Sequence, residues 1–372
     1  MAWRPQRIAV AGLGLLGASL AEAARRRWPD AKITGVSAPE TLAKATAAGL
    51  IQRGMGYADI DLAVADADLV ILCTPIDPIL NTLEAWAARP PACKPGCIFT
   101  DVGSTKADIC ALGAKAFPAS GPGVFVGSHP MAGSEKTGLE ARDPLLFQNA
   151  SWVICAEADA RSAEAAGRLQ DFAQALGARV TRMPAALHDE VAANVSHLPQ
   201  MLSTALASYV GGRREVVENC LQIAGGGFRD MTRLAASSFH VWEPILRSNR
   251  TAVKATVSGF RAHLDGVMAA LDGDLGAGYF TEGNRLRAQL STAKKGFAVP
   301  LSEILVDLED KPGELVRAFA PLAAAGLNVL DVEILKVREG EGGVLMMGFH
   351  GNEEAGKAII ELTRAGFKAR LR

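Results

Sequence analysis

The chain has 372 residues, of which 49% are apolar, so it is long enough to form two or three domains with buried cores. Its 39 Lys and Arg residues nearly balance its 40 Asp and Glu residues, which gives a net charge of -1. This balance argues against nucleic acid or an anionic membrane surface as a partner and favours a small polar substrate.

The N-terminus lacks the charged start, apolar stretch and small-residue cleavage site of a signal peptide, and no apolar run approaches membrane-spanning length. The six cysteines are scattered along the chain, which suits free thiols in a reducing cytoplasm. Cys93 and Cys97 lie close together, but no histidine or second cysteine pair accompanies them as zinc ligands would require. We therefore expect a cytoplasmic protein without a metal site.

From Gln6 to about Arg182, short β-branched or apolar runs alternate with longer alanine-rich segments of helical period. This alternation predicts a doubly wound α/β sheet, and we expect a Rossmann dinucleotide-binding domain over residues 1–183. The expected strands are Arg7–Ala11, Lys32–Val36, Leu69–Cys73, Cys97–Asp101, Val124–Gly127, Trp152–Ala156 and Arg179–Arg182.

The pattern changes after Met183-Pro184. Residues 184–297 form a nearly all-helical block, and since helices of this kind often pack against a second copy, we expect an all-α dimerisation and substrate domain in a homodimer. Residues 298–372 return to a βαββαβ order, which predicts a ferredoxin-like domain. Its expected elements are strands at Glu303–Leu308, Asn328–Val337, Gly343–His350 and Lys368–Leu371, and helices at Pro312–Ala325 and Glu353–Ala365.

The first expected strand runs directly into Gly12-Leu13-Gly14-Leu15-Leu16-Gly17, a G-x-G-x-x-G sequence that opens a helix. Gly12 permits the tight turn, Gly14 lets the backbone approach a pyrophosphate, and Gly17 allows close helix packing. The start of the helix offers N–H donors and a positive dipole end to the phosphates. The predicted cofactor contacts are Gly12, Gly14, Leu15, Leu16, Gly17, Ser37, Thr74 and Pro75.

The residue after the second strand leaves the choice between NAD and NADP open. An acidic residue there would bind the ribose 2′-hydroxyl of NAD, but this position is Ser37. No arginine lies beside Ser37 to bind the 2′-phosphate of NADP. We expect a preference for NAD with modest discrimination.

Five short motifs place reactive side chains beside glycines or at the ends of expected strands, where doubly wound sheets bind ligands. In chain order they are the glycine loop, V-G-S-T-K at 102–106, H-P-M-A-G-S-E at 129–135, S-H-L-P at 196–199 and G-G-G-F-R-D-M-T-R at 225–233. Over about residues 7–297 this series resembles the prephenate/arogenate dehydrogenase family. The resemblance implies a NAD(P)-dependent oxidoreductase of tyrosine biosynthesis that oxidises and decarboxylates prephenate or arogenate.

The resemblance also implies roles for individual residues. It makes His129 the catalytic histidine and Ser104 its partner at the substrate hydroxyl. A neutral imidazole, with an unperturbed pKa of ~6.5, can accept the hydrogen bond of that hydroxyl near neutral pH. The guanidinium of Arg233 would bind a substrate carboxylate. The other implied substrate contacts are Ser134, Glu135, His197, Gly226 and Trp242.

Some of these side chains also fit purely structural roles. His197 fits a buried histidine with satisfied hydrogen bonds, and Trp242 fits core packing. The neighbouring pair Arg229-Asp230 fits a structural ion pair.

Asp310-Lys311-Pro312-Gly313-Glu314-Leu315 resembles the D-x-P-G-x-L signature of ACT domains. Pro312 is expected to open the helix, and Gly313 to leave backbone N–H groups accessible to a ligand carboxylate. The resemblance implies that Asp310, Pro312, Gly313 and Asn328 bind tyrosine or a related amino acid that lowers activity. Two alternatives stay open: a domain that serves only dimerisation, and tyrosine that competes directly at the substrate pocket.

Two other functions stay open as well. A β-hydroxyacid dehydrogenase would explain the glycine loop and the helical block, but not the S-H-L-P and G-G-G-F-R-D segments. A regulatory protein that binds a dinucleotide without turning it over would have no use for His129, Ser104 and Arg233. Prephenate and arogenate themselves differ only in a keto against an amino group, so the motifs favour neither.

Overall fold

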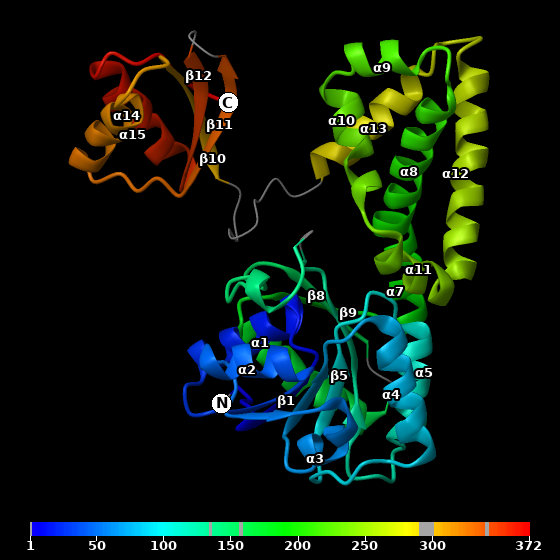
Figure 1. Ribbon diagram of the computed structural model, residues 1–372. Coiled ribbons are helices and arrows are strands. Elements are labelled where there is room, and N and C mark those ends of the chain that lie inside the picture. Colours follow the sequence, from blue (N-terminus) through cyan, green and yellow to red (C-terminus); the bar gives the residue numbers. More distant parts are fainter. Residues whose placement is uncertain (1, 134–135, 156–158, 290–300, 339–341) are drawn as a thin grey trace. The chain divides into compact units, whose positions relative to one another are not determined.

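The computed structural model describes residues 2–133, 136–155, 159–289, 301–338 and 342–372 (Figure 1). They form two compact units that divide in the sequence between Gly276 and Ala277. The first unit contains a parallel sheet followed by helices, and the second ends in a βαββαβ domain. The expected fold class is confirmed. None of the described helices is long and apolar enough to cross a membrane.

A parallel sheet is the centre of the first unit, and its described strands have the order β3-β2-β1-β4-β5-β6. The strands are β1 (Arg7–Ala11), β2 (Lys32–Val36), β3 (Arg53–Met55), β4 (Leu69–Leu72), β5 (Ile98–Asp101) and β6 (Val124–Phe125). The order reverses between β1 and β4. The carboxyl ends of these two strands therefore form the crevice at which doubly wound sheets bind ligands.

Both faces of this sheet are buried, which explains why its strands read as continuous apolar runs. Along β1, Ile8 and Val10 face one core, and Ala9 and Ala11 face the other. The helices that pack on the first face are α1 (Leu15–Arg27), α2 (Pro39–Ala47) and α6 (Ala160–Ala175). Those on the second face are α3 (Ile60–Val64), α4 (Ile76–Ala88) and α5 (Ala107–Ala116).

The expected strand Val124–Gly127 is confirmed only for Val124–Phe125, because the chain then leaves the parallel sheet. β6 ends at Phe125, and β7 (Gly127–Pro130) begins a separate sheet. There β7 pairs antiparallel with β8 (Ser151–Cys155), which pairs parallel with β9 (Arg179–Arg182). His129 therefore lies within a strand rather than after one.

Strand β3 was not expected from the sequence. Its three residues include a glycine, and the strand is mostly exposed, so neither apolar alternation nor β-branched side chains indicate it. Two 3₁₀ turns, Tyr57–Asp59 and Leu139–Ala141, complete the connections of this part.

The described residues from Ala185 to Gln289 are mainly helical, as expected. The helices are α7 (Ala185–Ala192), α8 (Leu198–Gly212), α9 (Val217–Ile223), α10 (Gly226–Thr232), α11 (Phe239–Ser248), α12 (Arg250–Ala270) and α13 (Ala277–Gln289). Between α7 and α8 the chain is π-helical over Ala193–His197, and a 3₁₀ turn, η4 (Arg233–Ala236), follows α10.

The βαββαβ domain has an antiparallel sheet with the order β11-β12-β10-β13 among its described strands. Its elements are β10 (Ser302–Leu308), α14 (Glu314–Ala324), β11 (Asp331–Arg338), β12 (Gly342–Phe349), α15 (Gly351–Arg364) and β13 (Ala369–Leu371). Apolar side chains of β10 and β12 pack against both helices in one core. The ferredoxin-like arrangement is confirmed.

The start of α14 differs from the expectation. Pro312 was expected to be the first helical residue, but the helix begins at Glu314. The cause is Gly313, whose φ of 86° is a left-handed conformation that cannot be part of a right-handed helix. Pro312 therefore stands outside the helix, in the loop that leads to it.

Replacing Gly17 or Gly14 of the first loop with alanine should change the stability of the protein by different amounts. A Cβ at Gly17 would come 1.8 Å from the carbonyl oxygen of Gly12, whereas a Cβ at Gly14 would meet no described atom within 4 Å. Gly17→Ala should lower the free energy of unfolding of the ligand-free protein by about 1–3 kcal/mol, because the backbone must shift. Gly14→Ala should change it by less than about 0.5 kcal/mol. Urea unfolding measures both, and equal stability of the two variants would contradict the close packing at Gly17.

Candidate active site

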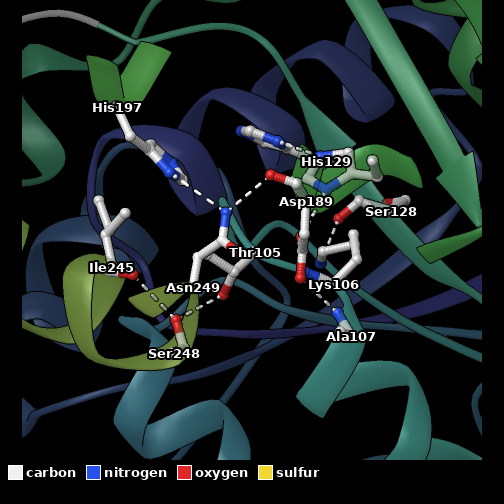
Figure 2. Close-up of polar contacts among 12 residues, drawn as sticks. Thr105, Lys106, Ala107, Ser128, His129, Asp189, His197, Ile245, Ser248 and Asn249 are labelled. Atoms are coloured by element: carbon white, nitrogen blue, oxygen red, sulfur yellow. Dashed lines mark hydrogen bonds and ion pairs between the residues drawn. The ribbon is translucent and has the colours of Figure 1, made fainter. Parts of the chain in front are cut away.

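Polar side chains from several segments meet near the carboxyl end of β5 (Figure 2). Thr105 and Lys106 follow that strand, His129 lies in β7, and Asp189 lies in α7. Asn249 precedes α12. Residues that are up to 144 positions apart in the sequence thus form one network, which depends on contact between the sheet and the helices that follow it.

Two histidines and one carboxylate form a chain of hydrogen bonds. Nδ1 of His129 lies 2.9 Å from Nε2 of His188, and Nδ1 of His188 lies 2.8 Å from Oδ1 of Asp189. The Asp189 carboxylate also accepts the backbone N–H groups of Lys106 at 2.7 Å and of Ala107 at 2.8 Å. These two N–H groups open α5, so the carboxylate lies at the positive end of that helix.

The surroundings keep His129 neutral. The ring is half-buried, and its removal from water, together with the positive charge of Lys106 and the nearby His188 and His197, lowers the pKa of His129 well below its usual value. Burial opposes ionisation of Asp189. The hydrogen bonds from His188 and from the N–H groups of Ala107 and Lys106 nevertheless hold the pKa of Asp189 below its usual range.

A fully buried ion pair supports the strand that carries His129. Nζ of Lys106 pairs with Asp101, at the end of β5, and both side chains are 0% exposed. Nζ of Lys106 also donates to the carbonyl of Ser128 at 2.8 Å, and the Ser128 N–H donates to Oδ1 of Asp101 at 3.1 Å. The pair thus ties the end of β5 to the residue just before His129.

A third histidine joins the same network. His197 is buried, and its Nδ1 lies 3.3 Å from Nδ2 of Asn249, which donates to the carbonyl of Asp189 at 2.8 Å. The ring of Trp242 lies edge-on to His197, with ring centroids 5.9 Å apart. Burial lowers the pKa of His197 to about 4, against the opposing charge of Asp189. His197 is therefore neutral near pH 7.

Two further contacts join the nucleotide-binding segment to the helices. Oγ1 of Thr105 lies 2.9 Å from Oγ of Ser248, and Arg247 pairs with Asp77 on α4. They hold α11 against the first turn of α4 and against the loop that follows β5.

The structure brings together part of the predicted substrate site. His129, His197 and Trp242 belong to the network, and half-buried Ser104 immediately precedes Thr105 in the loop after β5. The remaining predicted residues are placed differently. Gly226 and Arg233 are exposed, at the start of α10 and of η4, and both elements pack along α8. Ser134 and Glu135 lie outside the described residues.

The loop between β1 and α1 has the predicted geometry. Gly12 has a φ of 99°, which favours glycine, and the close approach at Gly17 excludes a side chain there. Leu15 and Leu16 form the half-buried first turn of α1, and Ser37 is buried at the end of β2. A Cβ at Gly12 would come 2.9 Å from the backbone nitrogen of Thr74, which, with Pro75, precedes α4. The predicted cofactor residues therefore lie just after the carboxyl ends of β1, β2 and β4, which are neighbours in the sheet.

Sequence reasoning gave no role to several residues of the network. The motifs containing Lys106, His188-Asp189 and Asn249 are visible in the sequence, but nothing local shows that they meet. A histidine followed by an acidic residue near the start of a helix was the available signal. No group of three or more His, Cys, Asp or Glu side chains among the described residues could hold a metal ion.

Three parts of the chain match known families. Residues 20–182 match "Prephenate dehydrogenase, nucleotide-binding domain", and residues 184–280 match "Prephenate dehydrogenase, dimerization domain". The chain belongs to the prephenate dehydrogenase family. Residues 302–365 match the ACT domain. The resemblance drawn from the five motifs and from the D-x-P-G-x-L signature is confirmed.

Individual relatives agree with this family. The chain is 30% identical to the prephenate dehydrogenase of Lactococcus lactis subsp. cremoris over 363 residues, which are 96% of this chain and 98% of the relative. It is similar to the crystal structure of Synechocystis arogenate dehydrogenase, with 30% identity, a TM-score of 0.65 and coverage of 76% of this chain and 99% of that one. It is also similar to the prephenate dehydrogenase of A. aeolicus in complex with hydroxyphenyl propionate and NAD+, with 26% identity, a TM-score of 0.68 and coverage of 78% and 100%.

In this member of the prephenate dehydrogenase family, removing one charge of the buried pair of Lys106 and Asp101 should strongly lower the stability of the protein. Lys106→Met should lower the free energy of unfolding by about 3–5 kcal/mol, because it leaves the Asp101 carboxylate buried without its partner. Adding Asp101→Asn should restore part of that loss, since the buried charge is then removed. The matched control is Lys94→Met, which breaks the partly exposed pair with Asp68 and should cost less than about 1 kcal/mol. Urea unfolding of the four proteins tests this, and equal losses for Lys106→Met and Lys94→Met would contradict it.

Proposed function

We propose that this enzyme oxidises prephenate to 4-hydroxyphenylpyruvate and CO2, with NAD as hydride acceptor, in tyrosine biosynthesis. The observation that carries the proposal is His129, a neutral imidazole held near the carboxyl end of the sheet that also carries the glycine loop. Arogenate, alone or beside prephenate, is the second candidate substrate, because structural relatives include an arogenate dehydrogenase. A dinucleotide-binding sensor without catalysis is not favoured.

The glycine loop fits a dinucleotide. No side chain of the described residues caps α1, so the N–H groups at its start are open to a phosphate, and the space beside Gly14 lets a ligand approach the backbone. Gly12, Leu15, Leu16, Gly17, Thr74 and Pro75 would border it. Ser37 neither repels nor binds a 2′-phosphate, so we propose NAD as the preferred cofactor without exclusion of NADP. When bound, the nicotinamide ring accepts a hydride from C4 of the substrate.

The side chains of this enzyme would supply alignment and a proton acceptor. His129 accepts the hydrogen bond of the C4 hydroxyl and takes its proton, with Ser104 at the same hydroxyl. Loss of CO2 makes the ring aromatic, so the reaction is strongly downhill and correct placement of C4 is the main requirement. Arg233 binds a substrate carboxylate through its guanidinium fork. The other proposed substrate contacts are Ser134, Glu135, His197, Gly226 and Trp242.

The activity is tested by following reduced-nicotinamide absorbance with prephenate, arogenate and a blank, each with NAD and with NADP. We expect turnover of at least one substrate, with kcat/KM favouring NAD by less than about 10³, or ~4 kcal/mol.

His129→Asn should lower kcat by roughly 10²–10⁴ at unchanged NAD affinity. Because the pKa of His129 is lowered, kcat/KM of the wild type should stay level as the pH falls through 6.5 and decline only below it. Turnover of neither substrate, or full kcat in the variant, would contradict the proposal.

We propose that tyrosine, or a related aromatic amino acid, binds the ACT domain and lowers activity. A cavity of about 450 Å³ lies at the start of α14, and Asp310, Pro312, Gly313 and Ile334 are among the residues that line it. The N–H group of Glu314 donates to the carbonyl of Lys311 at 3.3 Å, but no side chain of the described residues caps α14. The next N–H groups lie at the positive end of the helix, which would favour a ligand carboxylate. Asn328, in the loop after α14, is not among the described residues of this lining.

The proposed assembly is a homodimer formed through the helical segment. Many large apolar side chains are exposed on these helices, and a second copy would cover them. They include Leu187, Val195, Tyr209, Leu221, Ile223, Val241, Val257, Leu264 and Met268.

We place the domain boundaries at residues 1–183, 184–297 and 298–372, near those of the three family matches. The six cysteines are all free thiols, which supports a cytoplasmic location.

A charge placed in the ACT cavity should remove the proposed regulation. Ile334 lines the cavity and Val332 does not, although both are about half exposed on the same face of β11. Ile334→Glu brings a carboxylate that repels the ligand carboxylate, so inhibition by tyrosine should weaken by roughly 10-fold or more while turnover without tyrosine is unchanged. Val332→Glu is the matched control and should retain inhibition. If Ile334→Glu is inhibited as strongly as the wild type, tyrosine acts by competition at the substrate pocket instead.

A further inference from the structure

In the chain of hydrogen bonds that joins Asp189, His188 and His129, the backbone determines which group donates in each bond. Backbone N–H groups can only donate, and two of them, from Lys106 and Ala107, point at the two oxygens of the Asp189 carboxylate. The Asp189 carboxylate is therefore held as an acceptor. The residue is buried in α7, and its two bonds to the start of α5 hold the carboxylate in one orientation.

Because Asp189 can only accept, the donor and the acceptor in the next two bonds of the chain are determined as well. Because Asp189 accepts, Nδ1 of His188 must carry the proton of the 2.8 Å bond between them. When the His188 ring carries a single proton, that proton is the one on Nδ1, so Nε2 is bare and can only accept. The 2.9 Å bond to His129 then requires a proton on Nδ1 of His129.

We infer that Asp189 and His188 are positioning residues that hold His129 in the Nδ1–H tautomer, so that its Nε2 is the atom that takes the substrate proton. This rests on the proposed function. In the step, the O–H bond of the substrate hydroxyl breaks, its proton goes to Nε2 of His129, and its electron pair forms the C4=O bond as C4 gives up hydride, for which a bound NAD would be the acceptor. When CO2 leaves and the ring becomes aromatic, the oxygen at C4 takes the proton back from His129. The other tautomer would present an N–H to the hydroxyl and could not accept its proton.

The same chain stabilises the charge that the step creates. The protonated His129 ring is a cation close to Lys106, whose charge is opposed by Asp101. The Asp189 carboxylate lies two hydrogen bonds away and is connected to the cation through His188. His197 faces the same space from the π-helical segment and is neutral near pH 7. The carboxylate is thus the negative group that hydrogen bonds connect to the imidazolium, with His188 between them. In other sites a carboxylate orients a catalytic histidine directly.

Two substitutions of His188 separate positioning from packing. His188→Gln keeps the pattern, because a glutamine amide can donate to Asp189 through its nitrogen and accept from His129 through its oxygen. His188→Leu fills much of the same space but can do neither. We expect His188→Leu to lower kcat by roughly 10²-fold or more at nearly unchanged KM for NAD, and His188→Gln to recover at least about 10-fold of that loss. Equal kcat values for the two variants would show that His188 only fills space and would overturn the inference.

A spectroscopic measurement tests the tautomer without any turnover. In the full-length protein with ¹⁵N-labelled histidine, the two ring nitrogens of His129, assigned by their loss in His129→Asn, should show a protonated Nδ1 and a bare Nε2. Asp189→Leu removes the acceptor at Nδ1 of His188, so His188 can carry its proton on either ring nitrogen and His129 should show a mixture of the two tautomers. A wild-type His129 that already carries its proton on Nε2 overturns the inference even if the enzyme is active. If the expected tautomer is found but neither substrate is turned over, the proposed function is contradicted, and the inferred direction of the hydrogen bonds from Asp189 to His129 is supported.

Discussion

The carboxylate of Asp189 is the contact on which the arrangement of the site depends. It accepts hydrogen bonds from the first N–H groups of α5 and from the ring of His188. The backbone carbonyl of Asp189 accepts a further hydrogen bond from the side chain of Asn249. One residue therefore connects the loop after β5 to α7 and to the start of α12. The geometry around His129 is a property of the contact between the sheet and the helices, and neither segment would determine it alone.

The buried pair of Lys106 and Asp101 shows how this site tolerates charges in its interior. Removing two charges from water is costly, and their attraction offsets that cost only when the remaining donors and acceptors are also satisfied. Here Asp101 accepts N–H groups from Gly103 and Ser128, and Lys106 donates to a backbone carbonyl. The result is a support at the start of β7, with a positive charge that helps to keep His129 neutral.

Much of the fold could be predicted because its signals are local. The glycine loop, the apolar strands and the βαββαβ order each follow from spacing within about 30 residues. The separate sheet of β7, β8 and β9 could not, because apolar strands reveal their length but not their partners. The rule that proline opens a helix failed at Pro312 because the next residue, Gly313, adopts a left-handed conformation. In the site, motifs indicated His129, but its link to His188 depends on segments 59 positions apart and has no local signal.

The pairing of β7 with β8 determines on which face of the sheet the imidazole of His129 lies. His129 lies opposite Val153, and because side chains alternate along a strand, a slip of one position would turn the imidazole to the other face of the sheet. The position of His129 is therefore set by the ladder and not by the length of the connection between the two strands. The exposed residues of that connection can be exchanged while the histidine stays in register, although its Leu139 and Phe147 are buried in the core. Under the proposed function, changes at these exposed positions would leave the proposed proton acceptor in place.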